Sequence, residues 1–278
     1  MNALLRRCLP TALVLTAVAT GAAPLWFGPS RAAPDEDDVS LSTPASRRAV
    51  DRALTWLADH QLENGAWGSD VGFKLNEEYK VEQYDKPHVG VTALAGTAFL
   101  AAGNFPERGP HAKSVKKALE FVLAAQDKSS GMITEHGTRM YSHAFATLFL
   151  AEVFGTTPDP RVRTALQKAV EFTYKSQNSQ GGWRYAPNAE DSDMSITVCQ
   201  VVALRAAKNK GIRVPKESID AAVDYVLNSA VTESSHWPFQ QGSFLYQYRP
   251  NNDAAAQQTR TSFALTAAGL TTLYGAGL

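Results

Sequence analysis

The chain of 278 residues carries apolar residues at a helical spacing in four places. Each place has an aliphatic residue, an Ala three positions later and an aromatic residue three positions after that Ala. The four segments are 50–57, 115–122, 166–173 and 219–226. Apolar residues at i, i+3, i+4 and i+7 are typical of a helix with one buried face. The pattern therefore predicts four half-exposed helices, each of which begins one copy of a repeated unit.

A second kind of helix follows each of these segments. The four stretches are apolar nearly all round, are rich in Ala, Thr and Gly, and cover 91–102, 142–154, 195–207 and 261–274. A helix without a polar face is buried on several sides. Alternating outer and inner helices indicate an all-α solenoid or α/α toroid, and the crowded inner helices favour the toroid. Four helical-hairpin repeats predict an open or incomplete ring.

The turns between the paired helices share a glutamine. It stands eight residues after the repeat Ala in three copies, as Gln61, Gln126 and Gln177, and a glycine-containing turn follows. Trp67 and Trp183 end two of these turns, and Met132 stands at the aromatic position in the second copy. Two longer connections, 68–88 and 241–258, are expected to be loops at one end of the helices, where function usually lies.

The N-terminal sequence predicts export to the periplasm or secretion. Residues 1–33 contain an Arg pair, an apolar run of about eleven residues and small residues, as a signal peptide does. Residues 34–44 are acidic and are expected to be a disordered lead-in before one domain, 45–278. The mature chain has a net charge of −3 and a single cysteine, Cys199. Composition therefore gives no indication of nucleic-acid binding, and an intrachain disulfide is excluded.

The sequences QLENGAW, at 61–67, and QNSQGGW, at 177–183, resemble the repeat of squalene and oxidosqualene cyclases and of protein prenyltransferase β-subunits. Two further stretches resemble the bacterial exported proteins with prenyltransferase and squalene oxidase repeats. They are MYSHAFATLFLAEVFG, at 140–155, and the stretch that begins at Asp191. The resemblance covers about 45–278. It implies the α/α toroid of these terpenoid cyclase-like proteins and an isoprenoid-like or other apolar ligand.

Asp191 and Asp193 are the candidate catalytic residues. Class II terpene cyclases carry Asp-x-Asp-Asp, and here Asp193 matches the proton donor while Met194 replaces the last Asp. Such a donor is a carboxylic acid kept protonated by apolar burial and neighbouring carboxylates. The alternative is that both carboxylates cap the N-terminus of a helix, where free N–H groups and the helix dipole favour negative charge.

Five further residues are candidates for ligand binding. Tyr141 and His143 begin an inner helix, and Trp67, Trp183 and Tyr185 lie in turns. The structural alternative is capping by His143 and wedging of the turns by the aromatic rings. No metal or cofactor is expected, because the single cysteine of the mature chain lies in an apolar helix and no His pair has ligand spacing.

Our leading prediction is therefore an exported binding protein on the cyclase fold, without established catalysis. Its ligand, which is isoprenoid-like or another lipid, or a peptide, is expected at the loop-bearing end of the toroid, and assembly into a homo-oligomer stays open. One alternative is acid-catalysed isoprenoid cyclisation, and another is a glycan-active α/α-toroid enzyme.

Overall fold

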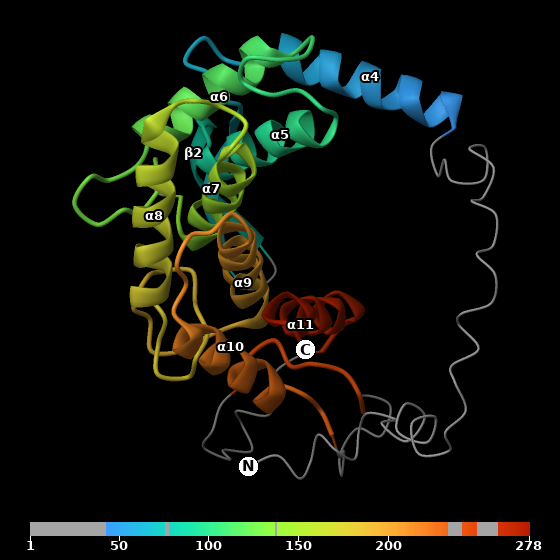
Figure 1. Ribbon diagram of the computed structural model, residues 1–278. Coiled ribbons are helices and arrows are strands. Elements are labelled where there is room, and N and C mark those ends of the chain that lie inside the picture. Colours follow the sequence, from blue (N-terminus) through green and yellow to red (C-terminus); the bar gives the residue numbers. More distant parts are fainter. Residues whose placement is uncertain (1–42, 76–77, 137, 233–240, 249–260) are drawn as a thin grey trace, which may run out of the picture. The chain divides into compact units, whose positions relative to one another are not determined.

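The computed structural model describes residues 43–75, 78–136, 138–232, 241–248 and 261–278 (Figure 1). The predicted signal peptide, 1–33, and the lead-in up to residue 42 lie outside the described residues. The chain divides into two compact units, one of 1–53 with 232–241 and one of 54–231 with 242–278. In the first unit the Thr43 hydroxyl accepts a hydrogen bond from the Ser46 amide, at 3.1 Å. Helix α4 therefore begins with a hydroxyl cap at the edge of the predicted lead-in.

The described residues confirm the predicted all-α fold class. They form eight helices and one antiparallel pair of strands, β1 (Gly68–Leu75) and β2 (Glu78–Pro87). The helices are α4 (Pro44–Asp59), α5 (Val89–Ala101), α6 (Ala112–Ala124), α7 (Met140–Val153), α8 (Pro160–Lys175), α9 (Met194–Asn209), α10 (Lys216–Asn228) and α11 (Phe263–Ala276). None of these helices combines the length and apolar character needed to cross a membrane.

The helices of the second unit pack in two layers. We call α5, α7, α9 and α11 the inner layer, because each packs on the next in this order (Figure 1). Helices α6, α8 and α10 form the outer layer. Helix α6 packs on α5, α8 packs on α7 and α9, and α10 packs on α9 and α11. The division follows from composition, since the inner helices are apolar nearly all round and can be covered on several sides. This helix packing is that of an α/α toroid-like fold.

Three corners between the layers share one hydrogen-bond pattern. In each, the glutamine amide donates to the carbonyl of a glycine in its own turn and to a carbonyl near the start of the next outer helix. The acceptors are Gly65 and Ser114 for Gln61, Gly131 and Ala165 for Gln126, and Gly181 and Ser218 for Gln177, at 2.7–3.0 Å. Each glutamine therefore joins the turn after one outer helix to the first turns of the next outer helix.

The second corner differs from the prediction by one residue. Its turn is one residue longer, so that Ile133, and not Met132, occupies the place of the tryptophans. The Ile133 amide donates to Nδ1 of His143 at 3.1 Å. In the first corner the Trp67 amide donates to the Thr92 hydroxyl in the same way, at 3.0 Å. His143 thus stands where other inner helices carry a threonine.

The first long connection is more ordered than predicted. Strands β1 and β2 pair in it as an antiparallel hairpin, with Gly68 opposite Pro87. The stretch YKVE, at 79–82, alternates apolar and polar residues, which is the period of a strand. In the second connection the carbonyl of Tyr246 accepts a hydrogen bond from the Met194 amide, at 2.8 Å. This backbone contact holds Tyr246 at the N-terminus of α9.

Candidate functional site

Asp193 lies at the N-terminus of α9, and its side chain has no exposed surface. One carboxylate oxygen accepts hydrogen bonds from the Ile196 amide, at 2.9 Å, and from the Ser195 hydroxyl, at 2.6 Å. The other accepts from Nη1 of Arg184, at 2.7 Å, and from the Tyr246 hydroxyl, at 3.3 Å. Four donors around two acceptor oxygens match the ionised form of the side chain. The predicted capping alternative describes these contacts well.

Arg184 connects the two aspartates of the candidate motif. Its Nε lies 3.5 Å from Asp191, whose side chain is 45% exposed, whereas the Asp193 side chain is fully buried. Burial acts to lower the pKa of Arg184, but the charges of Asp193 and Asp191 outweigh it and the pKa is raised. The guanidinium also lies over the rings of Tyr185, at 4.7 Å from its centroid, and of Tyr246, at 5.8 Å. These are cation–π distances.

A series of aromatic rings runs from this ion pair onto α7. The Tyr185 and Tyr246 hydroxyls share a hydrogen bond. The Tyr185 ring lies 6.0 Å from that of Tyr141, which lies 6.4 Å from Phe145. The Tyr141 hydroxyl donates to Ser195 at 2.8 Å, and burial raises the Tyr141 pKa to about 12. We call Tyr141, Phe145, Tyr185 and Tyr246 the aromatic series.

Tyr141 and Phe145 of the aromatic series belong to an uncharged strip on the inner layer. The strip consists of three half-buried residues of α7 and the three half-buried residues at the matching positions of α9. They are Tyr141, Phe145 and Leu148 on α7, and Ser195, Cys199 and Val202 on α9. Burial raises the pKa of the Cys199 thiol to about 11, so the thiol stays protonated at neutral pH and is a poor nucleophile. The strip offers apolar contact and no reactive group.

Three of the predicted ligand-binding residues lie in the core instead. Trp183 is 1% exposed and donates from its indole to Thr173 at 2.8 Å, and Trp67 is 4% exposed and makes the equivalent bond to Leu57 at 2.9 Å. His143 is fully buried, with Nε2 3.0 Å from the Thr173 hydroxyl. Burial lowers the His143 pKa to about 4. The structure thus groups Tyr141 and Tyr185 with Asp193, and places the other three residues between the helix layers.

Sequence reasoning missed Arg184, Ser195 and Tyr246 as members of this site. Arg184 stands between two aromatic residues that were singled out, and an arginine beside a candidate carboxylate is a readable signal. Tyr246 lies 53 residues beyond Asp193, in the second long connection. Only the folded backbone brings that connection to α9, so the sequence gives no signal for the pairing.

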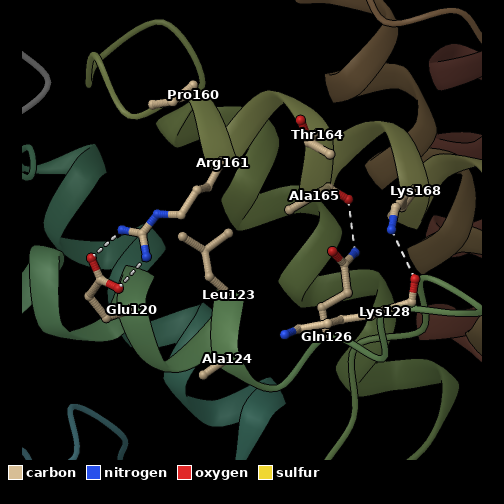
Figure 2. Close-up of a pocket in the computed structure, with 10 residues that line it drawn as sticks. All are labelled: Glu120, Leu123, Ala124, Gln126, Lys128, Pro160, Arg161, Thr164, Ala165 and Lys168. Carbon is tan, nitrogen blue, oxygen red and sulfur yellow. Dashed lines mark hydrogen bonds and ion pairs between the residues drawn. The ribbon is translucent and has the colours of Figure 1, made fainter.

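A separate groove of about 530 Å³ lies between α6 and α8 (Figure 2). Arg161 closes one end with two hydrogen bonds to Glu120, at 2.6 and 2.9 Å. At the other end Lys168 donates to the carbonyl of Lys128, at 2.9 Å. The side chains of Leu123 and other small or apolar residues lie between them. These charged groups bind one another or the backbone, so the groove is a gap between outer helices and has no catalytic constellation.

Among the described residues, no three His, Cys, Asp or Glu side chains come together as a metal site. No family model matches the chain. The chain is similar to the squalene–hopene cyclase of Zymomonas mobilis, with 25% identity over 173 residues, 54% of this chain. It spans about a quarter of the length of that relative. The similarity supports a terpenoid cyclase-like relationship.

Proposed function

We propose that this chain is an exported binding protein that holds an apolar, isoprenoid-like ligand along the uncharged strip of α7 and α9. The observation that carries the proposal is the aromatic series. Tyr141 and Phe145 are half-buried on α7, whereas Phe149 on the same helix is fully buried. Half-exposed aromatic rings next to aliphatic side chains supply apolar contact area to a ligand. Export rests on the sequence pattern of residues 1–33 alone.

Charge and shape favour a ligand with a long apolar part and one polar end. No charged side chain belongs to the strip, so an apolar chain would displace only water from it. At one end the strip meets Arg184 and the hydroxyls of Tyr185 and Tyr246. Those groups suit a hydroxyl or carbonyl better than a free anion, because Asp193 and Asp191 already neutralise Arg184. An isoprenoid alcohol has this chemistry.

A direct binding titration tests the proposal. Geranylgeraniol, below its aggregation concentration, is titrated into the wild-type chain and into Phe145→Ala. We expect saturable binding that weakens at least about tenfold in the variant, since removal of a buried aromatic contact costs more than about 1.4 kcal/mol. Tyr84→Ala, which removes a 67% exposed ring of the β-hairpin, is the matched control and should bind as wild type does. Equal binding by all three proteins, or none, contradicts the proposal.

Acid-catalysed cyclisation is the second candidate, and the similarity to squalene–hopene cyclase favours it. In that case Asp193 must carry a proton in the resting protein and lose it to an alkene. Arg184 at 2.7 Å opposes this step because it stabilises the carboxylate. Incubation with squalene and analysis of the products by mass spectrometry separates the two candidates. A cyclic product that disappears in Asp193→Asn supports catalysis, and unchanged squalene supports binding alone.

A further inference from the structure

The inner helices pack on one another through one repeated stripe. If the first residue of each helix is position 1, the stripe consists of positions 1, 5, 8 and 12. On α5 a Cβ at Gly96 would touch the Phe149 ring of α7. On α7 the Met140 carbonyl accepts a hydrogen bond from Gln200 of α9, at 2.9 Å. On α9 a methyl group of Val201 lies nearest to Gly275 of α11. Each inner helix therefore turns this stripe towards its successor.

The stripe is buried in α5 and α7 and exposed in α11. On α7 its four residues are each at most 1% exposed. On α5 Gly96 is buried and the other three residues are each at most 9% exposed. The stripe residues are Met140, Ala144, Thr147 and Ala151 on α7, and Val89, Ala93, Gly96 and Leu100 on α5. On α11 the same positions hold Phe263, Ala267, Leu270 and Tyr274. Phe263 is 91% exposed, Leu270 58% and Tyr274 81%. Helix α11 thus carries an apolar packing stripe that no described residue covers.

At the opposite edge of the inner layer, α5 leaves part of its packing face exposed. Positions 3, 7, 10 and 14 turn towards the preceding inner helix, as Gln200 of α9 does. On α7 these positions are buried, with Ala146, Phe149 and Val153 at 0%. On α5 Val91 is half-buried and Ala95 is 8% exposed, whereas Ala98 and the Ala102 that follows the helix are exposed. The C-terminal end of α5 therefore offers small exposed side chains where another inner helix would pack.

We propose that α11 of one chain packs on α5 of a second copy, so that the inner layer continues from one chain into the next. The large residues of α11 fit the small residues of α5, as ridges fit grooves between helices. Neither helix contains a charged residue, so the contact buries no charge. Contiguous exposed apolar surface of this kind marks an interaction site. The contact joins two different faces, which gives a ring if the rotation closes.

Sedimentation velocity over a range of concentrations measures the assembly. We expect a mass that is a multiple of the monomer mass at high concentration and that falls on dilution. Leu270→Asp should shift the dissociation midpoint at least tenfold upwards, because it places a charge in the contact. Tyr84→Asp makes the same kind of change on the exposed β-hairpin and should leave the assembly unchanged. Circular dichroism checks that both variants are folded. A monomer at every concentration for the wild-type chain overturns the proposal.

Disulfide trapping tests the identity of the two faces. In a background of Cys8→Ser and Cys199→Ser, one chain carries Leu270→Cys and the other carries Ala98→Cys. A covalent pair that forms on mixing, and forms faster than pairs within either single preparation, supports the α11-to-α5 contact. Pairs only between two Leu270→Cys chains would show α11 packed on itself and overturn it. Binding of the wild-type chain to phosphatidylcholine vesicles through Leu270, without self-association, would also overturn it.

Discussion

Nη1 of Arg184 lies 2.7 Å from a carboxylate oxygen of Asp193, whose side chain has no exposed surface. The same aspartate caps α9 through its other oxygen, at 2.9 Å from the Ile196 amide. Each contact uses a different carboxylate oxygen. One side chain therefore fixes both the N-terminus of α9 and the Trp183–Tyr185 turn. This relationship makes Asp193 a structural anion beneath the aromatic series.

Replacement of Asp193 by Asn should destabilise the protein. The amide can still cap α9, but Arg184 loses its buried counter-charge and an NH₂ group can face the guanidinium. Breaking a buried pair costs 3–5 kcal/mol, and we expect about 2–4 kcal/mol here because the Arg184 side chain is 23% exposed. Urea unfolding measures the loss. Asp191→Asn is the control and should cost less than about 1 kcal/mol, since Asp191 is 45% exposed. An Asp193→Asn variant with the same unfolding free energy as the wild type would indicate that Asp193 is protonated in the folded protein.

His143 should make stability depend on pH. Its pKa is about 4 in the fold, because of burial, against about 6.5 in the unfolded chain. Below pH 6.5 the unfolded state takes up a proton that the folded state excludes. Stability is therefore full above pH 6.5 and declines as the pH falls to about 4, by roughly 2–4 kcal/mol in all.

His143→Thr tests this assignment, because Thr92 holds the equivalent place in α5 and accepts the same kind of amide hydrogen bond. The variant should be less stable at pH 7, but its unfolding free energy should change less between pH 6.5 and 4. Chemical unfolding at several pH values gives both slopes. A slope equal to that of the wild type would assign the pH dependence to other groups.

Gly181 should be far less tolerant than Gly211, although both have a left-handed backbone with φ of +87° and +80°. A Cβ at Gly181 would lie 2.1 Å from the Ala221 carbonyl oxygen, whereas a Cβ at Gly211 meets nothing within 4 Å. Gly211→Ala should cost only the backbone strain of about 1–2 kcal/mol. Gly181→Ala should cost roughly 3–5 kcal/mol, because it also separates two outer helices. Similar losses for the two variants would show that the corner does not depend on close approach.

Local sequence patterns predicted the helices because each helix is specified by its own apolar period. The glutamines could also be recognised, since their contacts depend on a fixed spacing from the helix before them. The sequence pattern places Met132 at the tryptophan position, although Ile133 occupies it. The second turn has one extra residue, and the residue types of the turn do not reveal this. The β-hairpin was missed because its strand alternation was interpreted as a loop.

The candidate site was predictable only in part. Asp193, Tyr141 and Tyr185 lie on or next to α7 and α9, whose starts the sequence located. Tyr246 reaches Asp193 only through the path of the second long connection, which no local pattern fixes. The orientation of Trp183 depends on a carbonyl of α8, so the sequence could not separate a ligand platform from a core residue.

The most direct test of the binding account is an NMR titration with the Tyr and Phe rings isotopically labelled. Geranylgeraniol is added to the wild-type chain, and the ring signals are assigned by single substitutions. Binding along the strip should give progressive, saturable shifts at Tyr141, Phe145 and Tyr185, with Tyr84 unchanged. Unchanged signals from the aromatic series, or shifts confined to rings outside it, would contradict the proposal that this strip binds an isoprenoid-like ligand.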